Sequence, residues 1–212
     1  MRAPGRGPIP AAVFRNASIV AAAWLVCACS ASGPARPEQV VVRDESGFSI
    51  TEKVRVGASV RSDFASAVSL LQREEYDRGI ALLLEVTEAA PQLTAAHIDL
   101  GIAYARVNDL ERAEQSLERA LQLSPRHPVA NNELGIVYRK TGRFQRARES
   151  YQKALSAYPD FHLARRNLAI LCDVYIGDAP CALEHYEFYT QAIPNDEAAA
   201  MWIADLRNRA GQ

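Results

Sequence analysis

The sequence repeats every 34 residues through its central part. Segment 100–125 aligns with segment 134–159, and identical residues recur with one constant offset, six of them at positions that define the repeat. In the first segment these are Leu100, Gly101, Tyr104, Ala113, Ala120 and Pro125; in the second they are Leu134, Gly135, Tyr138, Ala147, Ala154 and Pro159. A fixed period of this length is typical of stacked supersecondary units, because one unit of that size cannot bury its own hydrophobic face. The period therefore constrains the fold before any other feature is considered.

The repeated positions have the chemistry of two antiparallel helices that cross closely. Small residues stand where the helices must approach each other, in the pairs Gly101 with Ala113, Gly135 with Ala147 and Ala67 with Gly79. Apolar residues recur at helical spacing and form a buried stripe: Leu100, Tyr104, Leu117 and Leu121. A proline cannot lie inside a helix without breaking it, so the recurring prolines mark the end of each second helix. This period and this pattern resemble the tetratricopeptide repeat.

The resemblance implies an all-α, right-handed α-solenoid of about four helix pairs. The predicted repeats cover residues 60–93, 94–127, 128–161 and 162–194. The first and fourth repeats depart from the pattern, as terminal units of such arrays do. Residues 195–212 place Ala199, Trp202, Ile203 and Leu206 on one helical face. We expect this segment to be a helix that caps the open end of the stack.

The N-terminus carries the features of an export signal. Arg2, Arg6 and Arg15 precede an apolar stretch at 17–28 that is too short for a comfortable membrane span. The stretch ends in Val26-Cys27-Ala28-Cys29-Ser30, which resembles the lipobox of bacterial lipoproteins. That resemblance implies a signal peptide at 1–28, lipidation of Cys29 and, because Ser30 follows it, sorting to the outer membrane facing the periplasm. An ordinary secretory peptide and an uncleaved anchor are the alternatives.

Residues 29–59 read as a tether followed by a short arm. The small, proline-containing segment 30–39 suits a flexible spacer. The β-branched residues on both sides of Asp44-Glu45-Ser46-Gly47 then predict a small hairpin or an extended arm. Two strands alone are only marginally stable in water.

The charge balance and the absence of catalytic motifs narrow the function. The formal net charge is −1, and no run of basic residues interleaves with aromatic ones, so we expect no nucleic-acid partner. Glycine-rich phosphate loops are absent. His97 and His127 have no sequence neighbour that suggests nucleophilic or acid–base catalysis. We therefore predict neither enzymatic activity nor a cofactor.

The first helices of a stack of this kind line its inner surface, and their free face can be followed from repeat to repeat. That face is apolar in the first half of the array and polar to basic in the second. The predicted partner groove consists of Phe64, Val68, Leu71, Ile98, Ile102, Arg106, Asn132, Ile136, Arg139, Lys140, Arg166 and Ile170. We predict a bound peptide with one apolar and one acidic end. Alternatively, the aliphatic column packs against the arm or the cap, and the charges are a solvated face.

Two cysteines remain besides Cys27 and Cys29, and both lie in the fourth repeat. Cys172 and Cys181 fall on either side of its turn. In an oxidising compartment they would form a disulfide, while two buried thiols are the alternative. A third hypothesis is a metal site that combines Cys181 and His185 with Cys172 or His162, although paired ligand motifs are absent.

Together these features predict a lipid-anchored scaffold or adaptor in a Gram-negative envelope, whose partners are a protein or peptide in the groove and the membrane through its lipid. The layout of signal, lipobox and short repeat array is similar to that of lipoproteins that serve pilus machines, some of which pilot secretin subunits. A structural role in another envelope machine is the alternative, as is a metal-dependent activity built on the fourth repeat. The sequence leaves the partner and the oligomeric state open, because repeat surfaces vary independently of the packing positions.

Overall fold

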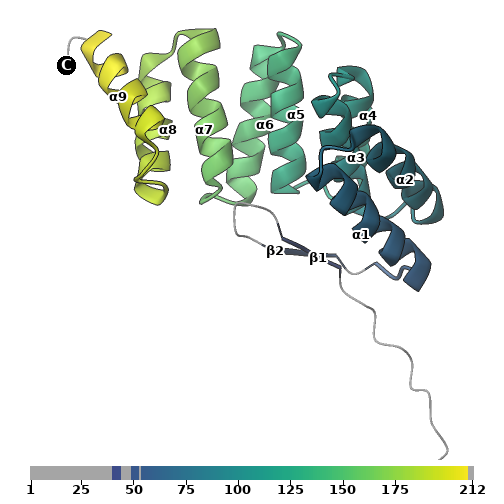
Figure 1. The fold of residues 1–212 in the computed structure, drawn as a ribbon. Coiled ribbons are helices and arrows are strands. Elements are labelled where there is room, and N and C mark those ends of the chain that lie inside the picture. The colour runs from purple at the N-terminus through teal and green to yellow at the C-terminus, as the bar shows by residue number, and fades with distance from the viewer. Residues whose placement is uncertain (1–39, 44–48, 53, 210–212) are drawn as a thin grey trace, which may run out of the picture. The chain divides into compact units, whose positions relative to one another are not determined.

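The computed structural model describes residues 40–43, 49–52 and 54–209. The predicted signal peptide, Cys29 and the tether up to residue 39 lie outside these residues. The chain begins with two strands and continues as a series of helices (Figure 1). Their bounds are β1 Val40–Arg43, β2 Ser49–Glu52, α1 Ala58–Gln72, α2 Tyr76–Ala89, α3 Thr94–Arg106, α4 Leu110–Leu123, α5 Pro128–Lys140, α6 Phe144–Ala157, α7 His162–Ile170, the π-helix η1 Leu171–Ile176, α8 Ala179–Ala192 and α9 Glu197–Arg209.

The arm takes the hairpin form, one of the two forms that the sequence allowed. Strands β1 and β2 pair antiparallel, with Val40 opposite Glu52 and Arg43 opposite Ser49.

The helices pack in the order in which they occur in the chain. Partners within a pair are α1 with α2, α3 with α4, α5 with α6, and α7 with α8. Each second helix also contacts the first helix of the next pair, and α9 packs on α8. The first helices contact one another from repeat to repeat, α1 with α3, α3 with α5, and α5 with α7. The predicted all-α solenoid of helix pairs is confirmed.

The small residues at the helix crossings are required by direct contact. A Cβ atom built on Gly101 of α3 would lie 2.6 Å from Leu117 Cγ of α4. A Cβ atom on Gly135 of α5 would lie 2.5 Å from Tyr151 Cε1 of α6. Such distances are far shorter than van der Waals contact, so the paired helices are as close as a glycine permits.

The turns within the pairs share one backbone conformation. Glu74, Asn108 and Gly142, spaced by 34 residues, have φ values of 61°, 62° and 75°. The corresponding residue in the fourth repeat is Gly177, at φ 75°, which stands 35 positions after Gly142. The additional residue of this repeat is accommodated in η1, because a π-helical turn holds one residue more than an α-helical turn.

One column of polar side chains joins each repeat to the preceding one. The Nε2–H of His97 donates to the Pro91 carbonyl at 3.1 Å. The Asn131 side-chain Nδ2 donates to the Pro125 carbonyl at 3.5 Å, and Arg165 Nη2 donates to the Pro159 carbonyl at 3.2 Å. Three different residue types, 34 positions apart, thus satisfy the carbonyl of the proline that follows α2, α4 and α6. The sequence does not reveal this column, because a histidine, an asparagine and an arginine fill the same role.

His127 is the buried N-cap of α5. Its Nδ1 accepts a hydrogen bond from the backbone N–H of Ala130 at 3.4 Å, and Pro128 follows it at the first helical position. Burial disfavours the charged imidazolium and lowers the pKa of His127 to about 4. The folded protein therefore holds this side chain neutral at pH values where an exposed histidine is partly protonated.

Gly135→Ala should lower the free energy of unfolding by about 1–3 kcal/mol, because the added methyl group overpacks the fully buried ring of Tyr151. Gly79→Ala is the matched control, since its nearest atom is a terminal methyl of the half-buried Leu71, which can rotate away. Urea unfolding of the two variants measures the difference. Equal losses of stability in the two variants would show that the rigid ring of Tyr151 is not the cause of the destabilisation.

The buried His127 should make stability depend on pH. Its pKa is about 4 in the folded chain and about 6.5 in the unfolded chain, so the unfolded state binds more protons between these values. Stability is therefore full above pH 6.5 and should fall by up to about 3 kcal/mol as the pH drops to 4. His127→Asn keeps an N-cap side chain that does not titrate, and should lose correspondingly less over the same interval. Urea unfolding at several pH values tests this, and parallel curves for the two proteins would refute it.

Candidate partner-binding groove

A pocket of about 260 Å³ opens between the first helices of the first two repeats, α1 and α3. Its lining is Val68, Leu71, Gln72, Tyr76, Asp99, Ile102, Ala103 and Arg106. Four of these were predicted groove residues: Val68, Leu71, Ile102 and Arg106. Aliphatic side chains line it together with one carboxylate and one guanidinium, a combination that suits an apolar side chain of a ligand with a polar group beside it.

Two predicted groove residues are buried, so their side chains do not line an accessible surface in this structure. Ile98 is 4% exposed and Asn132 is 2% exposed. The Asn132 Oδ1 accepts a hydrogen bond at 2.9 Å from the Asn167 side chain of α7, the next first helix. This column lies where successive first helices approach each other, so it forms an inter-repeat contact. Phe64, Ile136 and Ile170 are half-buried and pack against the core.

Two of the predicted groove arginines make contacts within the chain. The Arg139 guanidinium donates to the Tyr175 hydroxyl at 3.2 Å and lies 5.5 Å from the centre of that ring. Arg166 lies 5.6 Å from the centre of the Trp202 ring, and its Nε is 3.9 Å from an Asp196 carboxylate oxygen. The predicted binding of a partner's acidic end by Arg139 and Arg166 would have to compete with these contacts.

The other two groove cations are exposed. Arg106 has no hydrogen bond or ion pair among the residues that the structure describes. The Lys140 ammonium donates to the Ala105 carbonyl at 3.1 Å and has no carboxylate partner within the same residues. An ammonium has three donors, so two remain for a ligand. The positive charge available to a partner therefore lies in the middle of the array.

Helix α9 covers the C-terminal end. Its Trp202 ring lies 5.3 Å from the Tyr186 ring of α8, and Arg207 pairs with Glu187 of α8 at 2.6 Å. Arg209 pairs at 2.8 Å with Asp173, a residue of the same column as Arg139. The predicted cap therefore also contacts the groove face of the last repeat and reduces what is accessible there.

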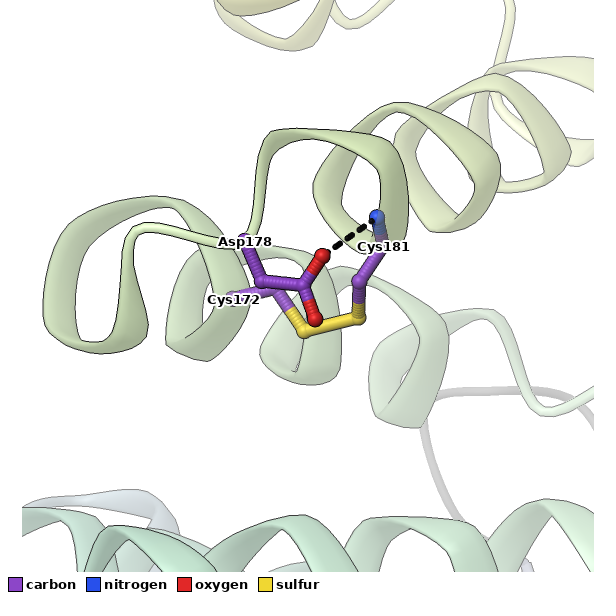
Figure 2. A group of neighbouring side chains, drawn as sticks. All are labelled: Cys172, Asp178 and Cys181. Carbon is purple, nitrogen blue, oxygen red and sulfur yellow. Dashed lines mark hydrogen bonds between the residues drawn. A yellow bond between two sulfur atoms is a disulfide. The ribbon is translucent and has the colours of Figure 1, made fainter.

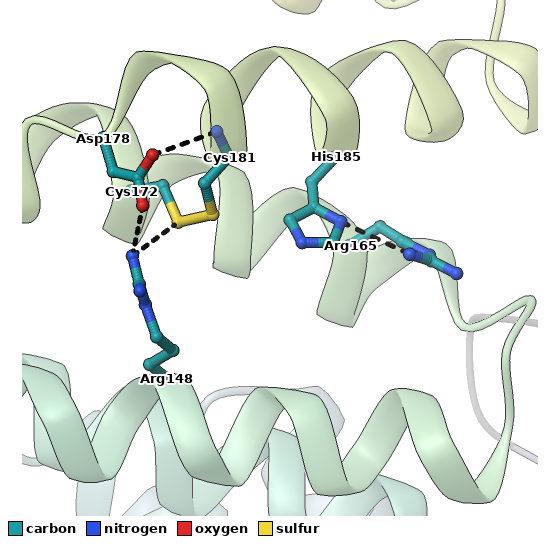
Figure 3. Close-up of a disulfide and its surroundings, with 6 residues drawn as sticks. All are labelled: Arg148, Arg165, Cys172, Asp178, Cys181 and His185. Carbon is teal, nitrogen blue, oxygen red and sulfur yellow. Dashed lines mark hydrogen bonds and ion pairs between the residues drawn. A yellow bond between two sulfur atoms is a disulfide. The ribbon is translucent and has the colours of Figure 1, made fainter.

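Cys172 of η1 and Cys181 of α8 form a disulfide, with their Cα atoms 5.9 Å apart (Figure 2). The Asp178 carboxylate beside them caps α8 by accepting the Cys181 backbone N–H at 3.2 Å. Arg148 of α6 donates to the same carboxylate at 2.8 Å and lies 3.7 Å from Cys172 Sγ (Figure 3). The Arg148 hydrogen bond, followed by that of the Cys181 N–H, lowers the pKa of Asp178.

The disulfide removes the ligands on which the metal hypothesis depended. A disulfide sulfur is no longer a thiolate and does not ligate zinc in the way a cysteine thiolate does. Cys172, Asp178 and Cys181 are the group that could otherwise meet around an ion in the described part of the chain. His185 lies apart from this group, with its Nδ1 3.3 Å from Arg165 Nη1 (Figure 3). The proposed cluster of Cys181 with His185 is therefore not formed.

Comparison with known proteins agrees with the repeat architecture. Two family models described as tetratricopeptide repeat match residues 64–128 and 100–171, and together they cover just over half of the chain. A search of curated protein sequences found no match. None of the described helices is long and apolar enough to span a bilayer.

Solved structures of similar fold include two that differ in origin. MamA from Desulfovibrio magneticus RS-1 is 19% identical with a TM-score of 0.65, over 73% of this chain and 87% of that chain. PilF of Pseudomonas aeruginosa is also 19% identical with a TM-score of 0.66, over 72% of this chain and 69% of that chain. At this identity the similarity concerns the fold alone.

Proposed function

Because this chain belongs to the tetratricopeptide-repeat family, we propose that it is a scaffold whose groove binds a segment of a partner protein. The observation that carries the proposal is the pocket between α1 and α3. It lies on the first helices, which are the inner helices of such arrays. Its lining of Val68, Leu71 and Ile102 gives a partner's apolar side chain a place to be buried, and this burial is the main source of binding free energy.

Charge supplies the orientation of the partner. Arg106 lies at the edge of the pocket, and Lys140 follows one repeat later at the same position of its helix. Carboxylates of the partner would form charge-assisted hydrogen bonds with these two groups, which are exposed and have no acidic partner within the described residues. The proposed ligand is therefore a segment with an apolar residue followed by acidic residues.

The proposed site of action is the periplasmic face of an outer membrane, with the chain held there by lipid on Cys29. The support is the basic flank, the short apolar stretch and the lipobox-like residues that precede Cys29. Stable anchoring needs more than one acyl chain, which a lipidated N-terminal cysteine provides. Assembly of a pilus or a secretion apparatus is the process we favour, because the layout of signal, lipobox-like residues and short repeat array is similar to that of lipoproteins in such machines.

The groove is tested by photo-crosslinking in intact envelopes. A benzoylphenylalanine residue at position 72, an exposed glutamine that lines the pocket, should capture a defined partner. The matched control is position 122, an exposed glutamine on the second helix α4, which should not. The double charge reversal Arg106→Glu and Lys140→Glu should lower capture at position 72 at least tenfold. Equal capture at both positions, or capture insensitive to the reversal, would sink the groove assignment. Mass spectrometry of the adduct identifies the machine.

The anchor is tested by metabolic labelling with an alkyne-bearing palmitate. The chain should incorporate the label, and Cys29→Ser should abolish incorporation and release the protein from the membrane fraction. Cys27→Ser should remain labelled, because Cys27 is the cysteine that fits the lipobox less well. An unlabelled parent chain would contradict the lipid anchor and leave the groove proposal standing.

A further inference from the structure

Three consecutive apolar residues are exposed at the end of the π-helix η1. Val174, Tyr175 and Ile176 are 67%, 41% and 39% exposed, and together they form what we call the apolar tip. Exposed apolar residues scattered singly need no explanation, but a contiguous group of them marks an interaction surface. The tip belongs to the turn of the fourth repeat, the repeat that carries the additional residue.

The tip is held in place by contacts on both of its sides. The disulfide between Cys172 and Cys181 closes the loop that contains it, and the Asp178 N–H donates to the Cys172 carbonyl at 2.8 Å across the base of the loop. On the other side the Tyr175 ring lies 5.1 Å from the Phe144 ring of α6. The exposed conformation is therefore preorganised, which reduces the conformational entropy lost on binding a partner.

A line of contacts connects the tip with the groove pocket. The Tyr175 hydroxyl accepts from Arg139, and Arg139 precedes Lys140 in the last turn of α5. The Lys140 ammonium reaches the Ala105 carbonyl of α3, beside Arg106 at the edge of the pocket. The order across neighbouring first helices is therefore the pocket, then Arg106, then Lys140 and finally the apolar tip.

We propose that the apolar tip is a second anchor for the same partner segment, an inference that rests on the proposed function. The ligand is an extended segment with an apolar residue at each end and acidic residues between them. Neighbouring packed helices are roughly 8–10 Å apart, so the two steps from α3 to α7 span roughly 16–20 Å. An extended chain covers this with about five or six residues. The two apolar anchors of the partner are therefore about six residues apart.

The charge between the two apolar surfaces favours an acidic segment of a partner protein over two competing occupants. The cations Arg106 and Lys140, which separate the two apolar surfaces, favour an acidic segment of a partner protein. A second copy of this chain is the first competing occupant. A lipid surface is the other, because exposed apolar residues near cations also occur in membrane-binding segments.

The test selects ligands without assuming their sequence. A phage-displayed library of random 12-residue peptides is selected on the oxidised full chain, and the most enriched peptide is synthesised with a fluorophore for anisotropy titration. Enriched peptides should carry acidic residues between two apolar residues about six positions apart. The double substitution Val174→Ser with Ile176→Ser should weaken binding about tenfold. Leu84→Ser removes an apolar side chain of α2 that is about as exposed as Ile176, and should leave affinity unchanged.

The outcomes separate this inference from the proposed function. If Ile102→Ser weakens binding and the tip substitutions do not, the second anchor is refuted and the groove stands. If neither Ile102→Ser nor the tip substitutions change the affinity for the selected peptide, or if no peptide is enriched, the groove proposal fails as well. Tip-dependent self-association in sedimentation, or tip-dependent binding to phosphatidylethanolamine–phosphatidylglycerol vesicles, would assign the tip to another occupant and overturn the inference.

The disulfide gives an independent readout. Reduction with a phosphine should weaken binding of the selected peptide several-fold, because the loop that presents the tip is no longer closed. The double variant Cys172→Ser and Cys181→Ser should bind as weakly as the reduced chain and should not respond to the phosphine. Affinity unchanged on reduction would refute a preorganised tip.

Discussion

The close crossing of the two helices in each pair is the contact on which the rest of the structure depends. Gly101 against Leu117 and Gly135 against Tyr151 bring the backbones together until no Cβ atom fits between them. With the two helices of each pair packed together, the first helices also contact one another from repeat to repeat. Residues 34 positions apart therefore come to lie in columns, and a surface read by a partner can extend over several repeats.

What a column can do depends on how closely neighbouring repeats approach. The Ile98 and Asn132 column lies between first helices and serves packing. The column of His97, Asn131 and Arg165 satisfies proline carbonyls of the preceding repeat. The column that includes Ile102 remains half-buried and borders the pocket. Adjacent positions of one helix can thus contribute to the core, to the inter-repeat contacts and to the proposed partner surface. The residues that stabilise the fold are therefore different from those proposed to bind a partner.

The end of the array modifies this pattern. In the fourth repeat one additional residue is accommodated as a π-helix, and a disulfide joins that helix to α8. Helix α9 then contacts Arg166 through Trp202 and Asp173 through Arg209. The basic groups expected at this end, Arg139 and Arg166, consequently have partners within the chain, and the apolar tip is exposed at the same repeat. Arg106 and Lys140 keep the exposed positive charge near the centre. The two ends of the array therefore differ, because the pocket lies between α1 and α3 and the apolar tip lies in the fourth repeat.

The sequence alone determined the helix pairs, their turns and the inward apolar stripe, because those features depend on contacts within a unit that recurs with nearly the same residues. Gly101, Tyr104 and the prolines could be recognised without coordinates for that reason. The polar column of His97, Asn131 and Arg165 is not visible as a repeat in the sequence, because three residue types fill one role. Only the tertiary structure decided that Asn132 is buried, that Arg139 and Arg166 have partners and that Cys172 pairs with Cys181. Each of these depends on distances between helices that are separate in the chain, and the periodicity of a sequence does not record such distances.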